Sequence, residues 1–97
     1  TYCSTKFALE GFTKSLAIEL APNGIRVNSI CPTFIKTPMT EPFLKDKDFK
    51  NQVLSMIPLG RLGEVEDLMG PFVFLASEAS SMMTGSSVLV DGGWTSR

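Results

Sequence analysis

What the sequence lacks already excludes several classes of function. Its 97 residues carry 9 basic and 10 acidic side chains, for a formal net charge of -1. This balance provides neither a basic surface for nucleic acid nor a polybasic face for anionic lipid. No uninterrupted apolar run approaches the roughly 20 residues that a membrane span needs, and no signal peptide is visible. We therefore expect neither nucleic acid nor a membrane as a partner.

The sequence is also poor in metal ligands. It contains no histidine, and its two cysteines, Cys3 and Cys31, do not have the spacing of a metal site. We predict no bound metal and interpret both cysteines as small buried hydrophobic residues. Two scattered thiols also favour a reducing, cytoplasmic location.

The first half of the chain has the pattern of a helix followed by a strand. Apolar residues recur at spacings of three and four over residues 4–20, which predicts an amphipathic helix. Pro22 and Gly24 then end the helix, and the β-prone residues 25–30 predict a strand that stops at Pro32. Because Thr1 opens the chain within the expected helix, with no capping residue before it, we interpret the chain as the C-terminal portion of a longer protein.

The second half predicts a long loop, a helix and a final strand. Residues 33–59 are irregular and rich in proline, with room for one or two short helices over residues 43–56, as in a lid or binding loop. An apolar helix follows the turn at residues 60–63, and Pro71 predicts that it is kinked or starts later than Glu64. Residues 87–90 form a continuous apolar strand of the kind that is covered on both faces.

This order of elements indicates an α/β fold with a parallel sheet. Two strands joined by a crossover need further strands and helices on each face, so we expect the missing neighbours to come from an upstream segment.

Tyr2 and Lys6 are the most informative pair in the sequence. They are four residues apart on the predicted helix and so share one of its faces. A nearby ammonium favours the phenolate over the phenol, which suits a general acid or base. Ligands of open α/β sheets bind at the carboxyl ends of the strands. The start of the helix and the end of the first strand, at Pro32 to Thr37, should therefore meet at one edge.

The sequence resembles the short-chain dehydrogenase/reductase family. The resemblance covers nearly the whole chain, in order and spacing, through Tyr2-Cys3-Ser4-Thr5-Lys6, residues 11–21, Gly24-Ile25-Arg26-Val27-Asn28, Pro32, Thr37-Pro38-Met39 and Val90-Asp91-Gly92-Gly93. It implies an enzyme that interconverts a secondary alcohol and a ketone with NAD or NADP. A sugar or polyol dehydrogenase and a 3-oxoacyl-thioester reductase both remain open.

The resemblance also implies roles for individual residues. Tyr2 would be the catalytic acid/base, while Lys6 would bind the nicotinamide ribose and lower the pKa of the Tyr2 phenol. The Ile35 backbone and the Thr37 hydroxyl would hold the nicotinamide carboxamide end of the cofactor. Pro32 would border the nicotinamide ring.

The segment after Pro32 carries the remaining expectations. Thr33 stands where the family usually has glycine, so its side chain would narrow the approach to the cofactor or add a hydroxyl near it. Three apolar residues are candidate walls of the substrate site, although ordinary loop packing explains each equally well: Phe34, Met39 and Phe43.

The resemblance further implies that residues 1–97 are the C-terminal part of a single doubly wound, Rossmann-type α/β domain, whose N-terminal, cofactor-binding half would lie outside the chain. The family's glycine-rich phosphate loop and catalytic serine are not in these 97 residues. We therefore expect the isolated chain to be inactive and the parent protein to act on a small alcohol or ketone, as a homotetramer. The alternative is a non-catalytic fragment that acts only by associating with other chains.

Overall fold

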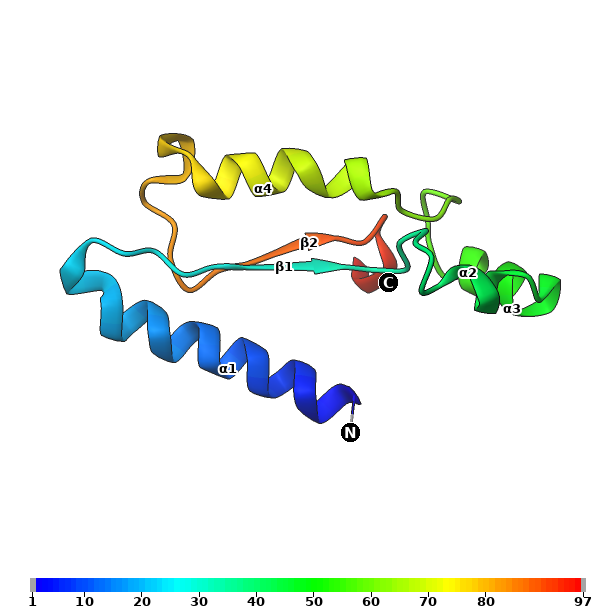
Figure 1. The fold of residues 1–97 in the computed structure, drawn as a ribbon, viewed down its shortest axis with the longest axis horizontal. Helices are drawn as coiled ribbons and strands as arrows, with labels where there is room; N and C mark the ends of the chain where they lie inside the picture. Colours follow the sequence, from blue (N-terminus) through cyan, green and yellow to red (C-terminus); the bar gives the residue numbers. More distant parts are fainter. Residues whose placement is uncertain (1, 97) are drawn as a thin grey trace. The chain divides into compact units, whose positions relative to one another are not determined.

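The structure is a computed structural model that describes residues 2–96, without the side chain of Tyr2. It divides into one unit of Thr1–Ile30 and Phe72–Val88 and a second of Cys31–Pro71 and Leu89–Arg97. Strands β1 (Ser29–Pro32) and β2 (Ser87–Val90) pair in a two-stranded parallel sheet, and each strand contributes residues to both units (Figure 1). The predicted α/β class with parallel strands is confirmed.

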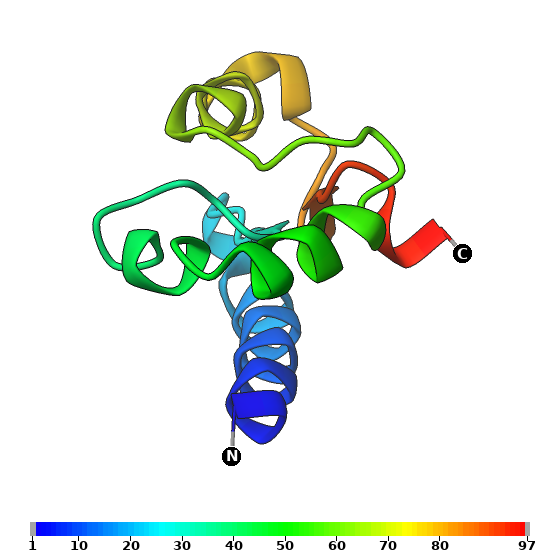
Figure 2. The same ribbon diagram turned by 90° about the vertical axis from the view of Figure 1, so that its right-hand side faces the viewer.

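In the first unit, helices lie on both faces of the strands. Helix α1 (Tyr2–Leu20) covers one face, and helix α4 (Met69–Ala76), which belongs to this unit from Phe72 onward, covers the other (Figures 1 and 2). The first helix ends as predicted: a 3₁₀ turn (Ala21–Asn23) follows it, and Gly24 has a φ of 72°. This helix–strand–helix layering is that of a doubly wound sheet.

Glu10 fixes α1 to the strands. Its carboxylate accepts a hydrogen bond from the Ser29 hydroxyl at 2.8 Å and a second from the Ser87 hydroxyl. One side chain on the helix therefore engages the first residue of each strand. Hydrogen bonds to an ionised acceptor are stronger than neutral ones, so this contact sets how the helix lies along the strands.

The first strand begins later than predicted. Residues 25–30 were expected to form it, but β1 begins at Ser29 and includes Cys31 and Pro32. Before Ser29, side chains take part in the pairing: the Val27 N–H donates to the Thr84 hydroxyl at 3.1 Å, and the Asn28 side-chain oxygen accepts from the Ser86 N–H at 3.0 Å. Val27 and Asn28 are therefore held beside the residues just before the second strand without forming a regular ladder.

Arg26 stabilises the end of α4. Its guanidinium donates to the carbonyl oxygens of Leu75 at 2.8 Å, Ser77 at 3.2 Å and Met83 at 3.1 Å. The last carbonyls of a helix have no partner within the helix and carry partial negative charge, so a cation is favoured there. Arg26 thereby connects the segment before β1 to α4 and to the loop that follows it.

Proline sets where α4 begins. A 3₁₀ helix (Val65–Leu68) comes first, and α4 starts at Met69, which places Pro71 in its first turn. Proline is tolerated in that turn because the N–H it lacks would have no helical partner there. The predicted late start is confirmed.

The second unit contains the two short helices expected in the long loop. Helix α2 (Glu41–Leu44) and helix α3 (Lys47–Ser55) follow one another (Figure 2). Asp46 caps α3 by accepting from the N–H groups of Asp48 and Phe49. The buried apolar side chains of this unit, within the described residues, are Val53 and Ile57.

An aromatic cluster and a tight turn complete this unit. The Phe34 ring stacks on Trp94 at 5.8 Å and meets Phe49 edge-on at 5.9 Å between centroids. Asp91 accepts from the Thr95 hydroxyl at 2.8 Å and from the Gly93 N–H at 3.0 Å. These bonds stabilise the carboxylate and lower the pKa of Asp91.

Several apolar surfaces are exposed. On β2, which has a helix on each face, the Leu89 side chain is still 58% exposed. On α4, Phe72 and Val73 are 65% and 67% exposed. None of the helices described is long and apolar enough to cross a membrane.

Candidate functional site

Helix α1 carries the predicted acid/base pair. Tyr2 and Lys6 both belong to this continuous helix, which confirms the helical spacing of their backbones. The side chain of Tyr2 lies outside the described part of the structure, and that of Lys6 is exposed. Both residues belong to the first unit, whereas the predicted residues from Pro32 to Phe43 belong to the second. Their meeting at one edge stays a prediction.

The segment after β1 is anchored to the loop before α4. Ile35 forms a parallel β-bridge with Gly63, in which the Gly63 N–H donates to Phe34 O at 3.0 Å and Gly63 O accepts from the Lys36 N–H at 2.8 Å. Both bonds involve the neighbours of Ile35. The N–H and C=O of Ile35 itself therefore face the side opposite Gly63.

On that opposite side, the carbonyl of Ile35 meets Thr40. The Thr40 hydroxyl donates to Ile35 O at 2.6 Å and accepts from the Thr37 N–H at 3.0 Å. The hydroxyl oxygens of Thr37 and Thr40 are 3.2 Å apart. Two predicted cofactor-binding residues, Ile35 and Thr37, are thus joined through one hydroxyl that the sequence analysis did not single out.

Thr33 and Ile35 open onto a cavity of about 480 Å³ within the second unit. Its wall combines three charged side chains with apolar and glycine residues: Ile57, Pro58, Leu59, Arg61, Gly63, Asp67, Leu89, Val90, Asp91, Gly92 and Gly93. Pro32 and Thr33 also line a second cavity of about 200 Å³, beside Trp94. The side chain at position 33, where the family usually has glycine, therefore borders open space.

Arg61 and Asp67 form an ion pair in the wall of the 480 Å³ cavity. The Arg61 guanidinium donates to both carboxylate oxygens of Asp67, at 2.8 Å and 2.9 Å, and the Glu64 N–H donates to the same carboxylate at 2.7 Å. The Arg61 hydrogen bond is the main cause that lowers the pKa of Asp67 to about 2, and the same pairing raises the pKa of Arg61.

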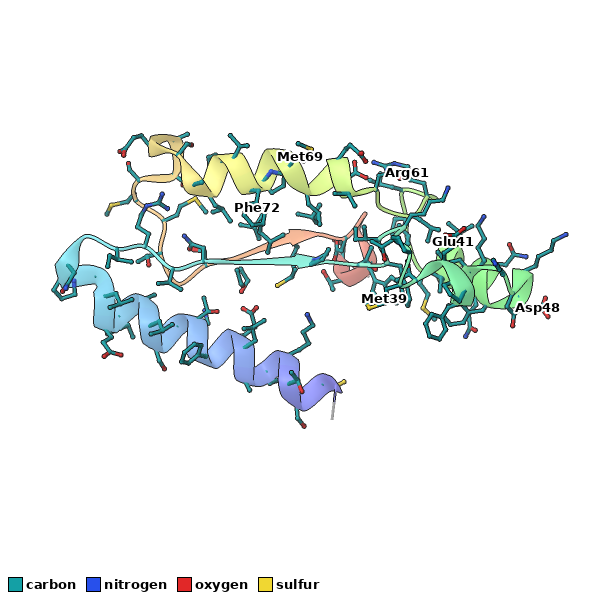
Figure 3. The ribbon with its side chains drawn as sticks, in the orientation of Figure 1. Met39, Glu41, Asp48, Arg61, Met69 and Phe72 are labelled. Atoms are coloured by element: carbon teal, nitrogen blue, oxygen red, sulfur yellow. The ribbon has the colours of Figure 1, made fainter. Side chains whose placement is uncertain are left out.

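The three candidate substrate residues lie in different surroundings. Phe34 packs between the rings of Phe49 and Trp94, which is the ordinary loop packing that the sequence left open. Met39 is 80% exposed and lies just before α2 (Figure 3), and Phe43, on α2, is also exposed. None of the three lines the 480 Å³ cavity.

Sequence reasoning missed three contributors to this region: Gly63, Arg61 and Thr40. The run Gly60-Arg61-Leu62-Gly63 was interpreted only as a turn. Gly63 allows close approach, because a Cβ at this position would overlap Ile35 Cδ1 and lie 3.4 Å from Phe34 O. The available signal was the gathering of one arginine, one glycine and three acidic residues within residues 61–67. For Thr40 the signal was its place three residues after Thr37.

Comparison of the sequence with known proteins identifies a matching family and similar relatives. The family described as enoyl-(acyl carrier protein) reductase matches residues 1–95. The L-xylulose reductase of Bos taurus is 50% identical over 93 residues, which are 96% of this chain and 38% of the relative. The chain thus spans well under half the length of this relative.

Solved structures give the same result. A protein of Agrobacterium tumefaciens assigned as a 2-deoxy-D-gluconate 3-dehydrogenase, with bound NADP, has a TM-score of 0.95 and 43% identity over 99% of this chain and 39% of its own. A short-chain type dehydrogenase/reductase of Mycobacterium marinum has a TM-score of 0.90 and 47% identity over 99% of this chain and 37% of its own. A 4-hydroxyisoleucine dehydrogenase complexed with NADH has a TM-score of 0.94 and 36% identity over 99% of this chain and 40% of its own. Sequence and fold agree that the chain belongs to the short-chain dehydrogenase/reductase family.

Proposed function

We propose that the protein containing this chain is an NAD(P)-dependent oxidoreductase that interconverts a secondary alcohol and a ketone on a sugar or polyol. The observation that carries the proposal is the presentation of Ile35. Its backbone N–H and C=O face one side of the turn, with the Thr37 hydroxyl two residues further along. A donor and an acceptor side by side match the carboxamide of a nicotinamide, which has one of each.

In this proposal the residues of the chain have separate tasks. When bound, the cofactor supplies or accepts the hydride. Tyr2 gives a proton to the carbonyl oxygen in reduction and takes one from the hydroxyl in oxidation. Lys6, one turn away on α1, binds the nicotinamide ribose and lowers the pKa of the Tyr2 phenol. Ile35 and Thr37 hold the nicotinamide, and Pro32 and Thr33 border it.

The substrate would lie beside the segment between β1 and α2. Of the three apolar candidates, Met39 and Phe43 are exposed and can contact a small molecule. Phe34 would instead support the segment by packing, because its ring already contacts Phe49 and Trp94. This division predicts that changes at Met39 alter the substrate KM, whereas changes at Phe34 lower stability.

The sugar or polyol assignment is supported by two similar proteins. One is named L-xylulose reductase and the other is assigned as a 2-deoxy-D-gluconate 3-dehydrogenase. The matching family carries the description of an enoyl-(acyl carrier protein) reductase, which keeps a 3-oxoacyl-thioester reductase as the second candidate. Incubating the intact protein with NADH or NADPH and either ketoses or a 3-oxoacyl thioester separates the two. Oxidation of the nucleotide only with the thioester would refute the sugar assignment.

The order of the matching motifs supports residues 1–97 as the C-terminal part of a single Rossmann-type domain. We therefore expect the isolated 97-residue polypeptide to show no turnover with either nucleotide. Turnover by that polypeptide alone would contradict the proposal that residues 1–97 are only the C-terminal part of the domain. The alternative, a fragment that acts only through association with other chains, predicts no turnover by the intact protein either.

We further propose a cytoplasmic homotetramer. The exposed apolar side chains on α4, Phe72 and Val73, provide a surface that a second subunit can cover. Cys3 is exposed and Cys31 is half-buried, so the expectation that both are buried is not met. Two scattered thiols still suit a reducing compartment. Light scattering on the intact protein gives its mass, and a monomer at micromolar concentration would refute the tetramer.

A further inference from the structure

The hydroxyl of Thr40 is used in an unusual way. Thr40 is the N-cap residue of α2, yet its side chain makes no capping hydrogen bond to that helix. Threonine at an N-cap normally accepts from the second or third N–H of its helix. Here the hydroxyl turns back toward the preceding turn, so its role lies there.

In that turn the hydroxyl connects two backbone groups. It donates its single hydrogen to Ile35 O, the shortest of its contacts at 2.6 Å and five residues back in the chain. Its oxygen accepts from the Thr37 N–H at 3.0 Å. The Thr40 hydroxyl therefore sets the distance between the Ile35 carbonyl and the Thr37 N–H.

Gly63 holds the same turn from the other side. Its N–H and C=O bond to Phe34 and Lys36, the two neighbours of Ile35. The bridge fixes the direction of the Ile35 peptide groups, and Thr40 fixes the carbonyl of Ile35 relative to Thr37. Thr37, Thr40 and Ile35 are all half-buried, which shields these bonds from competing water.

We propose that Thr40 is a positioning residue for the nicotinamide end of the cofactor, which it serves by presetting the spacing of Ile35 and Thr37. The inference rests on the proposed function, since it names what aligns that site. A preformed pair loses less conformational freedom on binding, so removing the Thr40 hydroxyl weakens binding of the nicotinamide portion alone.

The test compares two ligands on the intact protein. One is NADH or NADPH, whichever binds more tightly. The other is the matching nucleotide without nicotinamide, ADP-ribose or 2′-phospho-ADP-ribose. Thr40→Val keeps the shape of the side chain and removes every hydrogen bond of its hydroxyl, including those to Ile35 O and the Thr37 N–H. We expect it to raise the Kd of the reduced dinucleotide about 10-fold, the effect of one to two hydrogen bonds, and to leave the Kd of the shorter nucleotide unchanged. Thr40→Ser should restore wild-type affinity.

Ser55→Ala is the matched control. It removes a side-chain bond of the same 2.6 Å length to a backbone carbonyl, that of Gln52, at the end of α3 in the same unit. It should change neither Kd. The proposal would be overturned if Thr40→Val changed the Kd of the reduced dinucleotide no more than Ser55→Ala does. It would also be overturned if Thr40→Val raised the Kd of both ligands equally. If Thr40→Val and Thr40→Ala both fail to fold, Thr40 serves the fold and the proposal is wrong. A wild-type protein that binds neither reduced dinucleotide would instead overturn the proposed function, and this inference with it.

Discussion

Arg61 and Asp67 are joined at two points: Arg61 Nη1 lies 2.8 Å from Asp67 Oδ2, and Nη2 lies 2.9 Å from Oδ1. The pair joins the two ends of residues 61–67, a segment that contains Gly63, the bridge partner of Ile35, and the start of the 3₁₀ helix before α4. Arginine and carboxylate match each other in this parallel geometry, which fixes direction as well as distance. The ion pair therefore holds together the residues on either side of Gly63.

Acid should weaken this loop. The pKa of Asp67 is about 2 in the folded protein, against an ordinary value of 3.8. Because the folded value is the lower one, the stability from this pair is present above pH 3.8 and lost as the pH falls toward about 2. The urea midpoint should therefore decrease more between pH 6 and pH 3 in the wild type than in Asp67→Asn. Glu66→Gln is the control and should track the wild type; equal falls in all three proteins would contradict the prediction.

A methyl group at Gly63 should disturb the turn at Ile35 to Thr37, which we propose holds the nicotinamide. A Cβ there overlaps Ile35 Cδ1 and comes within 3.4 Å of Phe34 O, so Gly63→Ala must displace the Ile35 side chain or its backbone. We expect a higher KM for the cofactor. Gly11→Ala is the control, since its Cβ would meet no atom within 4 Å apart from the adjacent backbone of its own helix. It should stabilise the protein by about 1 kcal/mol. An unchanged cofactor KM in Gly63→Ala would show that the bridge tolerates the methyl group.

Arg26 should contribute more to stability than its half-exposed position suggests. Arg26→Ala removes the three hydrogen bonds to carbonyls at and after the end of α4. We expect a loss of about 2 kcal/mol in the free energy of unfolding, measured by urea titration, because bonds to a charged donor are the stronger ones. Lys14→Ala, which removes one exposed bond to Gly85 O, should cost less than about 0.5 kcal/mol. Similar losses in both variants would refute the role of Arg26.

Local chemistry made much of the fold predictable. Pro22 and Gly24 end α1 where the sequence indicated, and the apolar run at residues 87–90 is β2. The error in β1 arose because the Asn28 side chain occupies a position in the pairing that propensity assigns to the backbone. The periodicity of apolar residues cannot predict that a side chain will take the place of a backbone group in strand pairing.

The candidate site was less predictable because its geometry is non-local. Thr37 and Ile35 were identified through the family resemblance, but the Thr40 bond depends on how the turn folds back on itself. Gly63 is 28 residues away from Ile35 in the sequence, and only the folded chain brings them together. Phe34 looked like a substrate wall because aromatic side chains suit both binding and packing.

The central claim is that Tyr2 is the acid/base of a hydride-transfer enzyme. Tyr2→Phe in the intact protein removes only the phenolic hydroxyl, so it should lower kcat for ketone reduction by at least about 100-fold, the usual contribution of a general acid. The Kd for NADH or NADPH should stay near its wild-type value, because the ring and the rest of the site remain. Near-normal kcat in Tyr2→Phe, with the cofactor still bound, would contradict the account.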